Sequence, residues 1–226
     1  MNNFMISQSK IWDSILPRIS LIDSDPEKEI SNFLLDKLKN KKIDGLDIGC
    51  GFGRHTLLAL KMGLNMTSVD FSSEAINTLS SFFEKKRLFA KLYRASMDNL
   101  PFEDSTFDFS ISWCVLNHGT QAIFNKGLVE SIRVLRKNGN AIGLIMNKQD
   151  SRFGKGDIFD HDCYIFEKGL EKGICHYFPS TEEIKDSLQK ISNIQLIKHV
   201  SYSDKDTELF YPELKYTSHI LYIVSK

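Results

Sequence analysis

The stretch LDIGCGFGR, residues 46–54, decides the fold of this 226-residue chain. It joins the end of an apolar, strand-like run over 43–48 to the start of an amphipathic helical pattern over 54–62. The three glycines in between have no Cβ, so the backbone there can turn tightly and approach a ligand. Free N–H groups at the start of the helix point toward the same place. The stretch therefore predicts a strand, a ligand-facing turn and a helix.

The same alternation of strand and helix patterns continues along the chain. It predicts strands over 43–48, 65–70, 89–94, 107–113 and 140–146, with helices over 54–62, 73–86 and 121–137. Alternating strands and helices form a parallel sheet that helices cover on both faces. We therefore expect an α/β fold with right-handed crossovers.

The two flanks differ from this core. At the N-terminus we expect a short helix that Pro17 ends and a second helix with Ser24-Asp25 as cap and Pro26 in its first turn. Residues 147–180 fit no regular element well, which is typical of a functional lid. A helix over 181–191 and strand-like runs over 193–202 and 217–225 predict an antiparallel hairpin at the sheet edge.

The second strand contributes an acid to the same edge of the sheet. Asp70 ends that strand, 21 residues after Gly49, where a carboxylate can accept hydrogen bonds from ribose hydroxyls. The glycine spacing is G-x-G-x-G rather than the G-x-G-x-x-G of dinucleotide sites. Asp47 stands two residues before the first glycine and disfavours a pyrophosphate, hence NAD. The pattern favours a nucleoside whose other end is cationic and carries an amino group.

These motifs, in this order, resemble class I S-adenosylmethionine-dependent methyltransferases of the small-molecule type. LDIGCGFGRHT resembles the first motif of that family and VDFS resembles the acidic second motif. MDNLPFEDSTFDFSISW with CVLNH, and IRVLRKNG, resemble later segments. The resemblance implies a Rossmann-like three-layer sandwich with a seven-stranded, mostly parallel sheet, an antiparallel last strand and an N-terminal helical cap. It implies S-adenosyl-L-methionine as cofactor.

The resemblance also implies a domain plan. We expect a single domain over 1–226. Its parts are a helical cap (1–42), a cofactor-binding core (43–146), a lid (147–180) and a C-terminal helix with a β-hairpin (181–226).

The resemblance assigns cofactor-binding residues by position. The amino acid end of the cofactor is expected at Asp47 and the backbone of the 49–53 loop, the ribose at Asp70 and the adenine beside Phe71. The adenine edge is expected at the loop after the third strand, and the methyl group near the end of the fourth. The full set is Asp47, Gly49, Cys50, Gly51, Gly53, Asp70, Phe71, Ser96, Met97, Asp98, Trp113 and Cys114.

Two histidines are candidate catalytic residues. His118 follows the fourth strand, beside the expected methyl group, and a neutral imidazole there can take a proton from a hydroxyl or amine. His176 can close the pocket from the lid. Either can instead serve packing, and Trp12 belongs either to the pocket or to the core. Asp160-His161-Asp162-Cys163 has ligand-type side chains without ligand spacing on a regular element, so we expect no metal site.

Composition narrows the partners. Lys plus Arg and Asp plus Glu both number 29, so the chain lacks the basic excess of duplex-binding proteins, and we expect no DNA partner. The four cysteines form no C-x-x-C pair. No secretory signal or membrane-spanning run is evident, which favours a cytoplasmic protein without a membrane partner.

The sequence thus predicts methyl transfer to O or N of a small-molecule acceptor by in-line displacement. Two alternatives are a methyltransferase that acts on RNA or protein with a partner, and a non-catalytic S-adenosylmethionine-binding partner protein. An NAD-dependent oxidoreductase is disfavoured by the glycine spacing.

Overall fold

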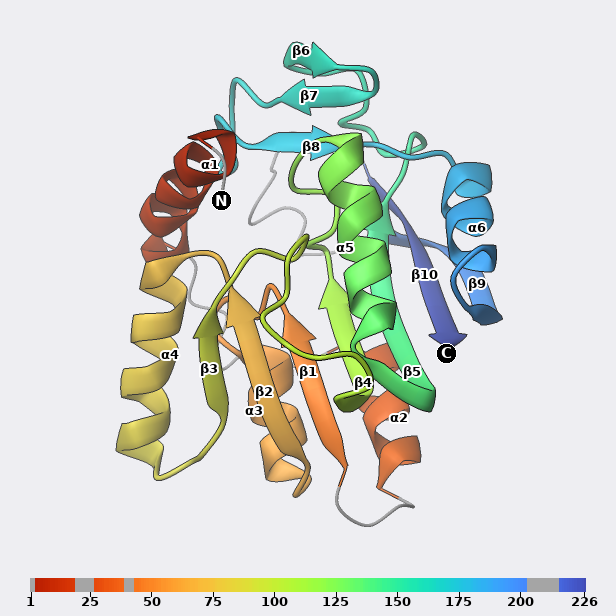
Figure 1. The fold of residues 1–226 in the computed structure, drawn as a ribbon. Helices are drawn as coiled ribbons and strands as arrows, with labels where there is room; N and C mark the ends of the chain where they lie inside the picture. Colours follow the sequence, from red (N-terminus) through yellow and green to blue (C-terminus); the bar gives the residue numbers. More distant parts are fainter. Residues whose placement is uncertain (1–2, 19–26, 39–42, 203–215) are drawn as a thin grey trace.

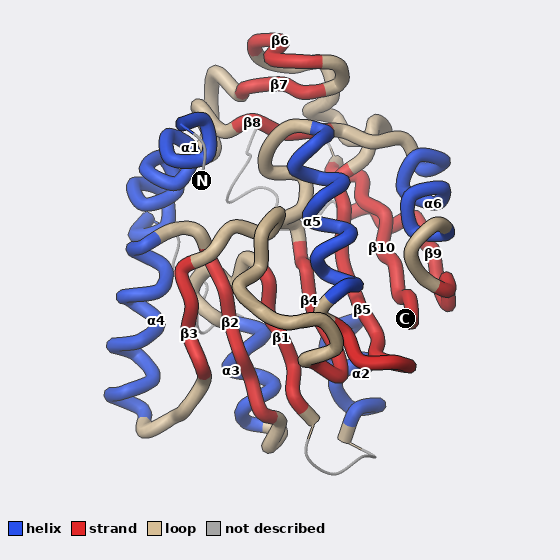
Figure 2. The backbone as a smooth tube through the Cα atoms, viewed as in Figure 1, coloured by secondary structure: helices blue, strands red, loops and turns tan. Residues whose placement is uncertain are grey.

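The computed structural model describes residues 3–18, 27–38, 43–202 and 216–226, arranged as Figures 1 and 2 show. One sheet has the strand order β3-β2-β1-β4-β5-β10-β9. Its strands are β1 (Asp44–Ile48), β2 (Asn65–Asp70), β3 (Lys91–Arg94), β4 (Phe107–Trp113), β5 (Leu135–Met146), β9 (Asn193–Tyr202) and β10 (Thr217–Ser225). The helices are α1 (Asn3–Ile15), α2 (Lys28–Lys37), α3 (Arg54–Lys61), α4 (Ser73–Lys86), α5 (Gln121–Arg133) and α6 (Thr181–Gln189), with a 3-10 helix over Leu16–Arg18.

The topology of this sheet confirms the expected fold class. Strands β1 to β5 pair in parallel, whereas β10 runs antiparallel to both β5 and β9. The chain order reverses between β1 and β4, which places a topological switch point at their carboxyl ends. In open sheets of this kind, ligands bind at that point.

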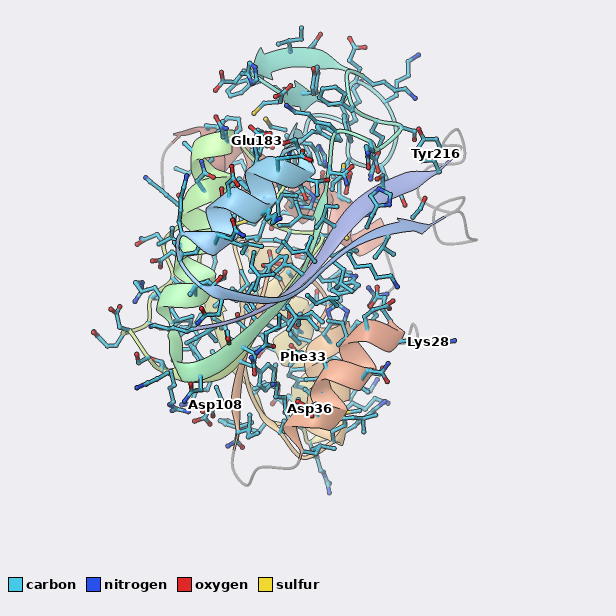
Figure 3. All side chains as sticks on the ribbon, turned by 90° about the vertical axis from the view of Figure 1, so that its right-hand side faces the viewer. Lys28, Phe33, Asp36, Asp108, Glu183 and Tyr216 are labelled. Atoms are coloured by element: carbon cyan, nitrogen blue, oxygen red, sulfur yellow. The ribbon has the colours of Figure 1, made fainter. Side chains whose placement is uncertain are left out.

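Helices cover both faces of the sheet (Figures 1 and 3). On one face, Ile30 and Phe33 of α2 and Ala59 of α3 pack against strand residues such as Phe109. On the other face, apolar residues of α5 and α6 pack against Leu46 and its neighbours. Figure 3 shows Phe33 on the sheet side of α2 and Lys28 near its outer end. Successive strand side chains point to opposite faces, so each strand contributes to both apolar layers.

Local signals place several element boundaries. Ser72 caps α4 by accepting a hydrogen bond from the Ala75 N–H, and Ser180 and Glu183 form a capping box at the start of α6. The strands expected over 65–70, 107–113, 193–202 and 217–225 have those bounds. The expected cap of α2 at Ser24-Asp25, with Pro26, lies outside the described residues.

Two expectations about local structure are wrong. The helix expected over 121–137 ends at Arg133, and β5 already begins at Leu135, which pairs with Phe107 of β4. The backbone pairing overrides the helical spacing of Leu135. Residues 147–180 are also not irregular throughout, because they contain a three-stranded antiparallel sheet. Its strands are β6 (Asp157–Asp160), β7 (Cys163–Ile165) and β8 (Cys175–Tyr177).

Helix α1 and this small sheet form a roof over the carboxyl ends of the parallel strands (Figures 1 and 2). The Gln8 side chain of α1 donates to the Gly173 carbonyl and accepts from the Cys175 N–H, at 3.1 and 2.9 Å. Phe4 stacks on Phe159 of β6 with ring centroids 4.9 Å apart. In the roof, α1 from the N-terminal part of the chain therefore contacts the small sheet that follows β5.

A second contact fixes α1 to the core. The Asp13 carboxylate accepts hydrogen bonds from the Ser72 and Ser73 hydroxyls and from the Glu74 N–H, at 2.6, 3.1 and 3.1 Å. Asp13 thus binds the positive end of helix α4.

Within the described ranges, no helix has the length and apolar character that crossing a membrane requires.

Candidate functional site

The glycine loop after β1 is held close to its neighbours. The N–H groups of Gly49 and Cys50 both donate to the Val69 carbonyl of β2, at 2.8 and 3.0 Å. Gly49 has a φ of +67°, and a Cβ at this position would stand 2.1 Å from a methyl carbon of Val115. Only glycine therefore fits between β1 and the loop that follows β4.

Asp70 lies at the end of β2, beside this loop. One carboxylate oxygen accepts from the Gly51 N–H and the other from the Ser72 N–H, both at 2.9 Å. Burial raises the pKa of Asp70 to about 6, even though both backbone N–H groups stabilise the carboxylate. Asp70 is therefore a buried acid that is charged at neutral pH and directly connected to the glycine loop.

These residues line a hollow of about 300 Å³ that is partly open to solvent. It lies at the switch point, between the ends of β1, β2, β3 and β4 and below the roof. Six of the residues that the sequence singled out line it together, and Ala95 and Val115 add apolar contacts. The six are Gly49, Asp70, Phe71, Ser96, Met97 and His118.

Other residues of the expected cofactor set lie nearby without lining this hollow. Gly51, Gly53 and Cys50 belong to the glycine loop, and the Ser96 hydroxyl donates to the Asp98 carboxylate. Asp47 is buried under the loop and accepts a hydrogen bond from the Thr56 hydroxyl at 2.7 Å.

Trp113 and Cys114 pack toward the α2 and α3 side of the sheet, where Trp113 contacts the His55 ring. Burial raises the pKa of Cys114 to about 12, so its thiol stays protonated and does not act as a nucleophile. The cofactor roles of these residues stay predictions.

The two candidate catalytic histidines lie side by side. An antiparallel backbone bridge joins His118, in the loop after β4, to His176 on β8. Their ring centroids are 5.0 Å apart. Asn117 holds this junction, because its side-chain amide donates to the carbonyls of Met146 and Tyr177 and accepts from the Met146 N–H. Local backbone structure thus brings two distant histidines together at one end of the hollow.

Glu171 completes this histidine cluster, and sequence reasoning missed it. Its two carboxylate oxygens lie 3.9 Å from His118 Nε2 and 3.0 Å from His176 Nε2. Burial alone would raise the pKa of Glu171, but the His176 side chain and the Arg152 guanidinium hold it well below the usual range. Burial lowers the pKa of His118 to about 3, so its imidazole is neutral. Glu171 lies in an irregular loop between Gly169 and Gly173, and no motif marks it.

The roof helix contributes an aromatic side chain to this end of the hollow. The Trp12 ring lies 4.8 Å, centroid to centroid, from the His118 ring. Its buried indole nitrogen has no hydrogen-bond partner among the described residues. This contact favours the interpretation of Trp12 as a pocket residue over that of a plain core residue.

The comparisons with known proteins agree with this architecture. Residues 46–139 match a family model described as a methyltransferase domain. Over this segment the chain is similar to methyltransferase domains. The matched segment runs from the end of β1 through Asp70 and His118 to Gly139 within β5. The segment that matches the methyltransferase model therefore contains every residue that lines the hollow.

Among curated relatives, an uncharacterized protein of Methanocaldococcus jannaschii is 38% identical over 144 residues, which is 63% of this chain and 57% of the relative. The malonyl-[acyl-carrier protein] O-methyltransferase of Buchnera aphidicola is 33% identical over 142 residues, which is 61% of this chain and 55% of the relative. The chain thus matches little more than half the length of each relative.

A solved structure extends the likeness of fold to most of the chain. The 1,6-didemethyltoxoflavin-N1-methyltransferase of Burkholderia thailandensis has a TM-score of 0.66 and is 15% identical. The match covers 98% of this chain and 89% of that one. That structure contains bound 1,6-didemethyltoxoflavin and S-adenosylhomocysteine.

Proposed function

We propose that this chain transfers the methyl group of S-adenosylmethionine to an oxygen or nitrogen atom of a small-molecule acceptor. The observation that carries the proposal is the hollow at the switch point. Gly49 and Asp70, which we assign to the cofactor end, and His118, which we assign to the acceptor end, all line it. The cofactor supplies an electrophilic methyl group, and the protein supplies orientation and a site that excludes water.

The cofactor end fits a nucleoside. Asp70 uses one lone pair of each oxygen for Gly51 and Ser72, and its further lone pairs can accept from two ribose hydroxyls. Phe71 and Met97 offer apolar contacts to an adenine ring. Gly49 lets the backbone approach without a Cβ. We keep the other cofactor residues assigned from the sequence as part of this proposal.

The acceptor end is built around His118. Its neutral imidazole can accept a hydrogen bond from an acceptor hydroxyl or amine. A group with a pKa of about 3 takes up a full proton poorly, so we assign His118 to orient the acceptor. His176 supports it from β8.

The roof and the relatives favour a small acceptor. Helix α1 and β8 cover this end of the hollow, which excludes bulk water and limits the size of an entering molecule. The Burkholderia structure holds a small heteroaromatic molecule. The Buchnera relative is named for O-methylation of a carrier-bound malonyl group. The first name supports an N acceptor on a small molecule, and the second supports an O acceptor.

Calorimetric titration with S-adenosylmethionine, S-adenosylhomocysteine and NAD tests the cofactor. We expect micromolar binding of the first two and none of NAD, and the reverse would overturn the proposal. Transfer of a labelled methyl group to a panel of hydroxyl, carboxyl and amine compounds then tests the acceptor. Label found only in added RNA or protein would favour a macromolecular substrate. Tight cofactor binding with no labelled product from any acceptor would favour a non-catalytic binding partner.

A further inference from the structure

Three metal-ligating side chains converge at the acceptor end of the hollow. His118 comes from the loop after β4, Glu171 from the loop between β7 and β8, and His176 from β8. One ligand atom of each lies within 4.8 Å of the other two. We infer that these three side chains bind a divalent transition-metal ion of the Zn²⁺ type. Two imidazoles and one carboxylate form a ligand set used in catalytic zinc and non-haem iron sites, where further positions stay open for substrate.

The hydrogen bonding of His176 supports a cation at this place. Its Nδ1 lies 3.2 Å from the Ile174 carbonyl, a contact in which Nδ1–H is the donor. A neutral ring with this donor carries a lone pair on Nε2, the atom that lies 3.0 Å from an oxygen of the Glu171 carboxylate. Two electron-rich atoms at that distance repel each other unless a cation or a proton lies between or beside them.

The geometry favours a metal ion over a proton. Although His176 Nε2 and Glu171 Oε2 are 3.0 Å apart, neither has a hydrogen-bond partner within the part of the chain that the structure describes. The His176 side chain is fully buried, so water does not replace that partner from bulk solvent. An Nδ1–H contact to a backbone carbonyl is the outer-shell bond that usually orients a metal-binding histidine.

The surrounding charges also favour a cation. Arg152 lies 4.0 Å from Glu171, but Asp150 binds the same guanidinium through contacts of 2.8 and 3.1 Å. The two carboxylates and one guanidinium leave a net charge of about −1 beside two imidazoles. A divalent ion would be attracted to this cluster, and outer-shell bonds of this kind hold a ligating carboxylate in place.

The position of the cluster suggests what the ion would do, and this part rests on the proposed function. His118 lines the hollow, and with its one lone pair on the ion it would position the acceptor through the metal instead of by a direct hydrogen bond. The Trp12 ring lies beside it, and the Trp12 indole N–H has no hydrogen-bond partner among the described residues. An acceptor hydroxyl bound to the ion would lose its proton to solvent, because a bound cation lowers the pKa of the oxygen. The oxygen would then form a bond to the methyl carbon while the carbon–sulfur bond breaks. The electron pair of that bond stays on sulfur, and a neutral thioether leaves.

Metal binding by the whole chain, without cofactor, tests the site itself. We would remove metal with EDTA, then titrate Zn²⁺ by calorimetry and Co²⁺ by visible absorption. We expect one ion per chain, with a Co²⁺ spectrum that shows nitrogen and oxygen ligands. Glu171→Gln should weaken binding at least about 100-fold, since loss of a ligand exceeds the usual outer-shell effect. Glu167→Gln, an exposed change in the same loop, should leave binding unchanged.

A second pair of variants, at two histidines, separates binding at the cluster from binding at the protein surface. His176→Gln should abolish the Co²⁺ spectrum, whereas His161→Gln, on an exposed histidine of the small sheet, should preserve it. Circular dichroism of each variant checks that it folds. No stoichiometric binding to the wild-type chain, or equal binding to all four variants, would overturn the inference. The 3.0 Å contact would then be a protonated ion pair.

Methyl transfer is measured separately. If the ion binds at the cluster and no acceptor is methylated, the metal site stands and the proposed function fails. If methylation proceeds at full rate after EDTA treatment and in Glu171→Gln, the proposed function stands and the role of the ion in acceptor activation fails.

Discussion

The two ends of the hollow are built in different ways. Most of the cofactor end comes from a continuous stretch of sequence, because the glycine loop, Thr56 and Asp70 all lie within 46–72. Asp70 accepts from the Gly51 N–H and Asp47 accepts from the Thr56 hydroxyl. Ser96 and Met97 join it from the loop after β3. The acceptor end is assembled from α1, the loop after β4 and the loop before β8, segments more than 50 residues apart. The comparison teaches that one end is defined by local backbone geometry and the other by tertiary contacts.

The first prediction tests how strictly backbone geometry defines the cofactor end. Gly49→Ala should destabilise the protein by about 3 kcal/mol, since the new Cβ adds an overlap with Val115 to the strain of a positive φ. Gly51→Ala is the matched control. It has a φ of +52° and nothing within 4 Å, so strain alone should cost about 1 kcal/mol. Urea unfolding measures both, and equal losses would contradict the packing argument.

The same contrast explains how much of the molecule the sequence could predict. Strands β1, β2 and β4 and helices α3 and α4 were predicted to within about a residue, because local apolar periodicity and glycines mark their ends. The end of α5 was not predicted correctly. Leu135 keeps helical spacing, but it begins β5 and pairs with Phe107 of β4. Strands β6 to β8 have three or four residues, too few to show alternation.

The candidate site shows the same division. Gly49 and Asp70 were predicted from two neighbouring motifs and the spacing between them, and both line the hollow. His118 and His176 were predicted as separate candidates, but their backbone bridge was not. Glu171 was missed altogether. Glu171 lies five residues before His176, but no motif links the two, and only the packing of β8 against the loop after β4 brings both beside His118.

The second prediction concerns the charge at the cofactor end. Asp70→Ala should weaken the binding of S-adenosylhomocysteine by about 2 kcal/mol, or roughly 30-fold, because it removes charge-assisted bonds to buried hydroxyls. Asp44→Ala is a suitable control, since Asp44 lies at the opposite end of the neighbouring strand. Calorimetry gives both affinities, with thermal unfolding to confirm the fold. Unchanged affinity in a folded Asp70→Ala protein would remove the ribose assignment.

The third prediction uses the pH dependence of the same acid. Since burial raises the pKa of Asp70 to about 6, cofactor binding should weaken by about tenfold per pH unit below 6, where the carboxyl must first lose its proton. The sign for the free protein is opposite. The stability that Asp70 contributes is present below its unfolded pKa near 4 and is lost as pH rises through 6.

The thermal shift caused by S-adenosylhomocysteine should therefore grow between pH 5 and 7. Asp70→Ala supplies the control, in which the shift should be small and nearly constant over that range. A wild-type shift that does not change with pH would mean that Asp70 does not meet the ligand.

The last prediction concerns the roof at the acceptor end, which a few polar bonds hold. Asp13→Ala removes three hydrogen bonds from α1 to the start of α4, while Gln8 still joins α1 to β8. We expect a loss of only about 1 kcal/mol, concentrated in α1. Native-state hydrogen exchange should then speed up about fivefold at α1 amides and stay unchanged in β1. Ser14→Ala, whose hydroxyl bonds within α1 at 2.7 Å, should change neither.

This experiment distinguishes a separately held roof from one that unfolds with the core. The hydrogen bonds from Ser72, Ser73 and Glu74 hold the pKa of Asp13 below its usual value, although partial burial opposes them. The contribution of Asp13 is thus present above its unfolded pKa near 4 and disappears as pH falls below it. Wild-type α1 should then resemble the variant at low pH. If exchange in β1 accelerates together with α1, the roof and the core form one cooperative unit, and the two ends of the hollow do not differ in stability.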